Sequence, residues 1–188
     1  MKTATYLGLF ERVRHTRCRQ LRTPILTCTV TATVALLLCA KCGVRLNFTP
    51  SLPIGLYVVS NASDAVLAEF CPPEPFARIS VARGYRHAGS CLDRDSPLLK
   101  PVVAMPGDVV VTSDRGIAVN GTLLANTAPL ERDSKGRLLP HFPFGTHVVI
   151  PGFVWVASTY HPLSFDSRYF GPIPSGSIRE RLKPFLVL

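Results

Sequence analysis

The sequence predicts a mainly β, antiparallel domain that follows one N-terminal transmembrane helix. Three observations support this fold class. Short runs rich in β-branched and aromatic residues recur between turn residues from residue 56 to residue 158. An Asn-Gly pair stands between two apolar runs, and one long uncharged apolar stretch follows a basic N-terminus. At 188 residues, the chain is long enough to bury one proper core.

Six short runs have the composition of buried or half-buried strands, and turn residues separate them. They are LYVVS at 56–60, AVLAEF at 65–70, PVVAM at 101–105, DVVVT at 108–112, HVVI at 147–150 and FVWVAS at 153–158. The 17 prolines are spread along the chain. That distribution suits short strands joined by rigid turns better than it suits a disordered linker.

The segments between these runs carry their own signals. Asn120-Gly121 is typical of a type I′ hairpin turn. FARISVARGY at 76–85 is expected to form one short helix that cannot begin earlier, because three of the four residues at 72–75 are prolines. Residues 126–145 contain Pro, Gly and charges with little periodicity, so we interpret them as a surface excursion rather than a domain.

The stretch from Pro24 to Ala40 is uncharged and predicts a membrane anchor. At about 1.5 Å per residue it is slightly shorter than a hydrocarbon core of ~30 Å, and Lys41 can snorkel to the membrane surface. Arginines dominate the residues before this stretch, whereas only Lys41 and Arg45 follow closely. This asymmetry predicts a cytoplasmic N-terminus and an exported remainder.

The alternative for this region is a cleaved secretory signal, which also has a basic leader and a short apolar run. The small-x-small cleavage pattern is poor here, because Leu38 and Ala40 flank Cys39. We therefore divide the chain into a basic cytoplasmic leader at 1–23, a transmembrane anchor at 24–43 and an exported β-rich domain at 44–188.

The net charge and the positions of the cysteines restrict which ligands and cross-links are expected. The formal charge of +9 arises largely from the leader, where membrane topology explains it, so a nucleic-acid partner is not required. Of six cysteines, Cys71 and Cys91 lie in the exported domain. They form either a disulfide, in an oxidising compartment, or two buried unpaired thiols. Their spacing fits no metal pattern, and we expect no metal and no cofactor.

Two residues of the exported domain can support nucleophilic chemistry. Ser51 stands between Pro50 and Pro53, on a stiff loop just after the anchor. A serine hydroxyl needs a base, and no histidine stands in a recognisable triad motif. Lys100 has apolar neighbours that could lower its pKa from about 10.4 towards 7–8. The ordinary alternatives are a serine that satisfies a turn and a lysine whose amine reaches solvent.

The segments TPSLPIGLY at 49–57, LLKPVVAMPGD at 98–108 and SFDSRYFGP at 164–172 resemble membrane signal peptidases of the serine/lysine type, in particular the conjugal-transfer branch of that family. The resemblance runs from about residue 47 to residue 178. It implies a signal-peptidase-like antiparallel β catalytic domain, with Ser51 as the nucleophile and Lys100 as the general base. The PGD turn at 106–108 would position Lys100.

The same resemblance assigns roles to four further residues. Asp166 is implied as a third catalytic residue with Arg168 as its ion partner, the alternative for this pair being a structural salt bridge. Ser164 would orient the lysine amine. Thr49 stands where the family carries a serine, and its hydroxyl would complete an oxyanion hole together with the backbone N–H of Ser51.

The resemblance implies a serine endopeptidase in the bacterial inner membrane, with one transmembrane pass and a periplasmic catalytic domain. Its substrate would be a pilin precursor matured for conjugative transfer, and the acyl-enzyme would be released by water or by the pilin's own amine, with cyclisation. Two alternatives remain open. One is a general signal peptidase, which TPSLP in place of S-x-S-M disfavours, and the other is a non-enzymatic pilus-assembly component.

Overall fold

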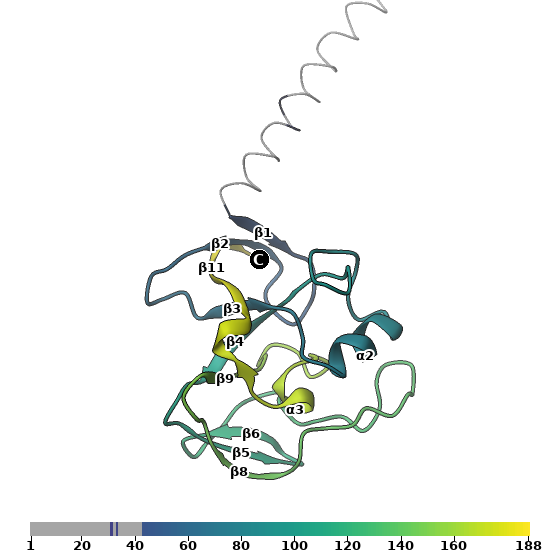
Figure 1. Ribbon diagram of the computed structural model, residues 1–188, viewed down its shortest axis with the longest axis vertical. Helices are drawn as coiled ribbons and strands as arrows, with labels where there is room; N and C mark the ends of the chain where they lie inside the picture. The colour runs from purple at the N-terminus through teal and green to yellow at the C-terminus, as the bar shows by residue number, and fades with distance from the viewer. Residues whose placement is uncertain (1–30, 32, 34–42) are drawn as a thin grey trace, which may run out of the picture. The chain divides into compact units, whose positions relative to one another are not determined.

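The computed structural model describes residues 31, 33 and 43–188 (Figure 1). The chain divides into two units after Val44, and all of the features below belong to the unit Arg45–Leu188, with the first strand starting one residue earlier. Within the described part of the chain, no helix is both long and apolar enough to cross a membrane. The leader at 1–23 and nearly all of the predicted anchor at 24–43 lie outside the described residues.

A seven-stranded sheet forms the larger part of the domain, in the order β1-β2-β11-β3-β4-β9-β10. Its strands are β1 (Val44–Asn47), β2 (Gly55–Val59), β3 (Leu67–Phe70), β4 (Leu98–Ala104), β9 (Phe153–Val156), β10 (Ile173–Pro174) and β11 (Ile178–Val187). The registered pairs from β2 through β10 are all antiparallel. The antiparallel β class expected from the sequence is therefore confirmed.

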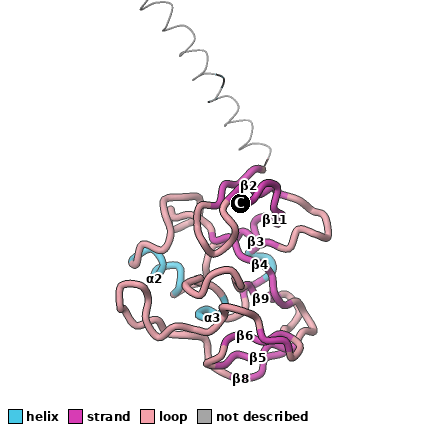
Figure 2. Tube along the Cα trace, turned by 180° about the vertical axis from the view of Figure 1, so that it is seen from behind, coloured by secondary structure: helices cyan, strands magenta, loops and turns pink. Residues whose placement is uncertain are grey.

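A second sheet has four strands in the order β7-β6-β5-β8. They are β5 (Val109–Ser113), β6 (Gly116–Val119), β7 (Thr122–Leu123) and β8 (Gly145–Val148). Figures 1 and 2 both place β5, β6 and β8 at the opposite end of the domain from β2 and β11. The PGD turn at 106–108 lies between β4 and β5, so it carries the chain from one sheet into the other.

The six predicted runs correspond to β2, β3, β4, β5, β8 and β9. However, β8 begins and ends two residues earlier than expected, and β4 begins three residues before the predicted run, so that it includes Lys100. The sequence did not predict β1, β10 or β11. The longest of these, β11, reads IRERLKPFLV and lacks a clean alternation of apolar and polar residues. Pro184 removes one hydrogen-bond donor from β11, and the register shifts between Pro184 and Leu186.

The predicted helix and hairpin are also present. Helix α2 (Phe76–Ala82) begins directly after the last of the prolines. Asn120 and Gly121 have φ angles of 49° and 85°, which is the type I′ requirement of two positive φ values. The turn joins β6 to β7. Two short elements complete the fold, the helix α3 (Ser167–Phe170) and the 3₁₀ turn η1 (Ser175–Ser177).

The core of the domain consists of three apolar clusters. The first packs the aromatic residues of α3 and its flanks against β3 and β9, and includes Phe70, Phe165 and Phe170. The second lies around Trp155 and reaches the four-stranded sheet through Val110 and Ile117. The third contains Leu52, Tyr57, Leu67 and Leu182. Through Leu52, it packs against the loop between β1 and β2. That loop carries Ser51.

Candidate active site

Strand β4 places Lys100 in the interior of the larger sheet. Lys100 pairs with Ala68 of β3, and β9 lies on the other side of β4. The residue is only 5% exposed. Burial lowers the pKa of its amine to about 8; the nearby carboxylate of Asp166 opposes this shift, and the guanidinium of Arg168 adds to it. With this pKa, about a tenth of the amine is neutral at pH 7, far more than for an ordinary lysine.

The loop between β1 and β2 places Ser51. Ser51 is 7% exposed, and its Oγ lies 3.2 Å from Oγ1 of Thr49. Pro50 and Pro53 flank the serine and restrict the backbone on both sides. The phenol of Tyr57 donates a 2.6 Å hydrogen bond to the carbonyl oxygen of Pro53, which ties the end of the loop to β2.

Ser51 and Lys100 line the same cavity, which has a volume of about 850 Å³. Thr49 and Ser164 line it as well. Within residues 43–188, no hydrogen bond joins Oγ of Ser51 to Nζ of Lys100. The fold therefore brings the predicted nucleophile and base, which are distant in the sequence, to one cavity, where no hydrogen bond joins them.

Asp166 and Arg168 form a buried bidentate ion pair beside this cavity. Nε and Nη2 of Arg168 donate to the two carboxylate oxygens of Asp166 at 2.8 and 3.0 Å. The side chains are 1% and 0% exposed. Asp166 also caps α3 by accepting from the backbone N–H of Arg168. Neither residue lines the cavity that holds Ser51 and Lys100.

Ser158 connects this ion pair to the loop between β1 and β2 that carries Ser51, here called the nucleophile loop. Its backbone N–H donates a 3.0 Å hydrogen bond to Oδ2 of Asp166. Its hydroxyl donates a short hydrogen bond to the carbonyl oxygen of Ser51. Asp166 is thus linked to Ser51 by way of Ser158, whereas its link to Lys100 is the electrostatic interaction given above.

The hydroxyl of Ser164 is buried and has no hydrogen-bond partner in the described structure. The expected hydrogen bond from Ser164 to the amine of Lys100 is absent here, although both residues line the cavity. An unpaired buried hydroxyl costs roughly 1–3 kcal/mol, so a partner supplied during the reaction would relieve that cost. Its orienting role stays a prediction.

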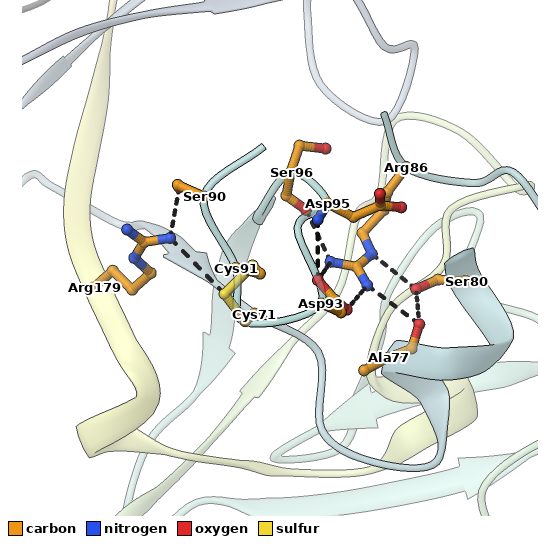
Figure 3. The surroundings of a disulfide bond; sticks show 10 residues. All are labelled: Cys71, Ala77, Ser80, Arg86, Ser90, Cys91, Asp93, Asp95, Ser96 and Arg179. Carbon is orange, nitrogen blue, oxygen red and sulfur yellow. Dashed lines mark hydrogen bonds and ion pairs between the residues drawn. A yellow bond between two sulfur atoms is a disulfide. The ribbon is translucent and has the colours of Figure 1, made fainter. Parts of the chain in front are cut away.

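One wall of the cavity comes from the segment between α2 and β4. Figure 3 shows part of this segment around the disulfide. Cys71 and Cys91 form a disulfide with a Cα–Cα distance of 5.9 Å, which attaches this segment to the end of β3. Arg86, whose side chain is fully buried, is surrounded by Ser80, Ala77, Ser96 and Asp93. The structure therefore contains the disulfide alternative of the two considered for these cysteines.

The excursion at 126–145 forms another part of the wall. It contains no named strand before β8, as expected, but Leu130, Asp133 and Leu139 line the cavity. The side chain of Asp133 is 5% exposed, and it accepts from the phenol of Tyr85 at 2.6 Å and from Arg137 at 2.7 Å. Although burial opposes it, these hydrogen bonds hold the pKa of Asp133 well below its ordinary value. This segment is better described as part of the site than as a simple surface excursion.

Comparison with known proteins identifies the family. Residues 17–186 match the family described as signal peptidase, peptidase S26. The chain belongs to this family. The match to the S26 signal peptidases covers β1 through nearly all of β11 and includes every candidate site residue. The resemblance found in the three sequence segments is therefore confirmed.

Relatives of this S26 chain include several conjugal transfer proteins. The plasmid transfer protein TraF of Escherichia coli is 36% identical over 163 residues, which cover 84% of this chain and 92% of the relative. Conjugal transfer protein TraF of Agrobacterium fabrum C58 is 38% identical over 147 residues, covering 76% and 81%. A probable conjugal transfer protein TraF of Sinorhizobium fredii is 40% identical over 143 residues, covering 72% and 73%. Among solved structures, a signal peptidase I of Enterococcus faecalis V583 aligns with 66% of this chain and 99% of its own, at 19% identity and a TM-score of 0.37.

Two residues of this S26 site were missed by sequence reasoning. Ser158 ends the apolar run FVWVAS, where a serine has no distinguishing pattern. Asn47 precedes the TPSLP segment and is 7% exposed, and its side chain makes five hydrogen bonds within the nucleophile loop. An asparagine before a proline-rich loop is a general turn signal, so this pattern indicates the role of Asn47 only weakly.

Proposed function

We propose that this S26 signal peptidase is a serine endopeptidase that uses Ser51 as the nucleophile and Lys100 as the general base. One observation carries the proposal: the two residues are buried in one cavity, and burial lowers the pKa of the lysine to about 8. A neutral amine near physiological pH is what a lysine base requires. The conjugal transfer relatives favour a substrate in the conjugation apparatus.

The reaction would proceed in two displacements. Oγ of Ser51 attacks the scissile carbonyl carbon while its proton passes to Nζ of Lys100. The oxyanion is stabilised by the backbone N–H of Ser51 and by the hydroxyl of Thr49, which turns its proton from the amide oxygen of Asn47 towards the oxyanion. As the C–N bond breaks, the protonated lysine returns the proton to the leaving amine, which gives an acyl-enzyme ester. Water then releases the acid, or an amine of the same pilin chain attacks and closes a ring.

The remaining candidate residues support these two in the proposal. Ser164 would turn its unpaired hydroxyl to the amine of Lys100 and orient it. Asp166 would hold Ser158 against the Ser51 carbonyl and moderate the charge around Lys100, with Arg168 fixing its carboxylate. We expect Asp166 to be essential for these reasons, whether or not it contacts the reacting atoms.

The cellular setting is part of the same proposal. The uncharged stretch at 24–40 and the arginines before it favour one pass through the bacterial inner membrane with the catalytic domain in the periplasm. The disulfide between Cys71 and Cys91 suits an oxidising compartment. A pilin precursor held in the membrane would present its cleavage site to the cavity from the same side.

Processing of a co-expressed conjugative pilin precursor tests the proposal. Intact-mass spectrometry of the pilin should show a trimmed product with the natural chain and the full-length precursor with Ser51→Ala or Lys100→Arg. A product lighter by a further water would show that the ends are joined. Normal processing by both variants would identify a non-enzymatic assembly component instead, and cleavage of unrelated secretory precursors would identify a general signal peptidase.

A further inference from the structure

The side chain of Asn47, the last residue of β1, bonds to residues on both sides of Ser51 in the nucleophile loop. Its Nδ2 donates to the carbonyl oxygens of Thr49, Leu52 and Pro53 at 2.9, 3.1 and 3.1 Å, so that two N–H groups serve three acceptors on both sides of Ser51. Its Oδ1 accepts from the backbone N–H of Thr49 at 3.2 Å and from the Thr49 hydroxyl at 2.8 Å. Asn47 stands at the end of β1, so the loop is fixed to the sheet.

The chemistry of these contacts fixes the orientation of the amide. Three carbonyl oxygens surround one end, and these cannot donate, so that end must be the NH₂ group. A backbone N–H and a hydroxyl meet the other end, which must be the oxygen. Asparagine supplies both kinds of group at this reach, whereas aspartate would direct a charged oxygen at the carbonyls.

This orientation also sets the direction of the hydroxyl pair. A hydroxyl has one proton, and that of Thr49 goes to Oδ1 of Asn47. In the 3.2 Å pair between Thr49 and Ser51, Ser51 is therefore the donor and Thr49 the acceptor. The position of Oγ of Ser51 in the resting site thus depends on Asn47 through the Thr49 hydroxyl as well as through the loop backbone.

We propose that Asn47 is a positioning residue for the reaction, which holds Ser51 and Thr49 in place at the cavity while its own polar atoms stay bonded to the loop. The inference rests on the proposed serine peptidase function and adds a residue to it. Because a misplacement of about 1 Å can lower a rate about 100-fold, the effect should appear mainly in turnover. Asn47 and its neighbours at 45–51 form part of the cavity lining, but both polar ends of the Asn47 side chain are bonded within the loop, so substrate affinity should change little.

Asn47→Ala and Asn47→Asp test this role in the full-length chain. Asn47→Ala removes all five hydrogen bonds, and Asn47→Asp keeps the shape and the acceptor but loses the donors. We expect kcat for pilin processing to fall about 100-fold in both variants, with KM within about threefold of the natural value. Asn61→Asp is the matched control, because Asn61 is exposed and its side chain has no hydrogen bond with a described residue. That control should retain full activity.

Hydrogen exchange provides a readout that does not depend on activity. Peptides covering residues 47–57 should exchange faster in both Asn47 variants, while peptides from β4 and β9 should be unchanged. A kcat within threefold of the natural value in the Asn47 variants would overturn the proposal. Full activity of these variants at temperatures well below their own melting temperatures would also overturn it, because the loss would then come from unfolding. If Ser51→Ala still processes pilin, the serine peptidase proposal fails. The role of Asn47 is tested independently of that function, because unchanged hydrogen exchange at 47–57 in the Asn47 variants would show that Asn47 does not stabilise the loop.

Discussion

The nucleophile and the base of the candidate site are held in opposite ways. Lys100 belongs to β4, and the backbone hydrogen bonds of an interior strand fix its position. Ser51 belongs to a loop, and side chains from outside that loop hold it, namely Asn47, Tyr57 and Ser158. We infer that the base should tolerate changes of its neighbours better than the nucleophile does. A loop held by a few side chains can be displaced by one substitution, whereas a strand cannot.

The largest expected effect is the loss of activity when either Lys100 or Ser51 is replaced. The two replacements should differ in their effect on the stability of the domain. Lys100→Met and Ser51→Ala should each reduce pilin processing at least about 1,000-fold. Lys100→Met should also stabilise the domain at pH 7 by up to about 3 kcal/mol, since a pKa lowered from 10.5 to about 8 reports the cost of burying the charged amine. Ser51→Ala should change stability by less than about 1 kcal/mol.

Urea denaturation of the natural chain and both variants at a series of pH values measures how the free energy of unfolding depends on pH. Below pH 8 the amine is protonated in both the folded and the unfolded chain, and the folded state carries the full cost of burial. Between pH 8 and 10.5 the unfolded chain binds more protons than the folded one, so the natural protein should gain stability as pH rises. The advantage of Lys100→Met should therefore disappear above pH 10.5. A variant no more stable than the natural chain at pH 7 would show that the amine is not desolvated.

The buried ion pair behind the loop should give the next largest effect. Arg168→Met leaves the carboxylate of Asp166 buried without its partner and leaves the carbonyls of Asn126, Pro162 and Ser158 without their donor. We expect a loss of about 3–5 kcal/mol in the free energy of unfolding. Arg78→Met is the control, because the Arg78 side chain is 81% exposed and pairs only with the exposed Glu74. Equal stability of the two variants would contradict the inferred structural role of Arg168.

The pH dependence of activity tests the base directly. Since the neutral amine is the active form, kcat/KM should rise about tenfold per pH unit on the acid side and level off above an apparent pKa of about 8. Rates of pilin processing between pH 6 and 10 check this. A profile that is flat across pH 8, or one that rises only above pH 10, would exclude Lys100 as a desolvated base.

Sequence reasoning predicted the strand that carries Lys100 more fully than the loop that carries Ser51. The run PVVAM has the composition of a buried strand, and apolar neighbours alone suggested the lowered pKa of Lys100. The supports of the loop come from Asn47 and Ser158, and no local pattern relates these residues to Ser51. Ser158 follows β9 and lies 107 residues from Ser51 in the sequence, so only the tertiary fold brings its hydroxyl to the Ser51 carbonyl.

The long strand β11 shows the same limit at the level of the fold. Its central position between β2 and β3 depends on tertiary packing, in which Leu182 is fully buried. The charges around Leu182 mask the strand pattern in the sequence. Periodicity therefore predicts elements whose own residues carry the signal, and it misses elements and contacts that are specified by the residues of their neighbours.

The smallest expected effect concerns the contact that links the ion pair to the loop. Ser158→Ala removes the hydrogen bond to the Ser51 carbonyl but keeps the backbone N–H that binds Asp166. We expect kcat to fall about tenfold, with stability lowered by roughly 1–2 kcal/mol. The hydroxyl loses two hydrogen bonds, the one to the Ser51 carbonyl and the one that it accepts from the backbone N–H of Tyr160, while the strand stays in place. Steady-state processing rates and urea denaturation measure the two quantities. Ser158→Thr keeps the hydroxyl and should recover most of the activity, and a failure of Ser158→Ala to slow turnover would show that the loop is positioned from the Asn47 side alone.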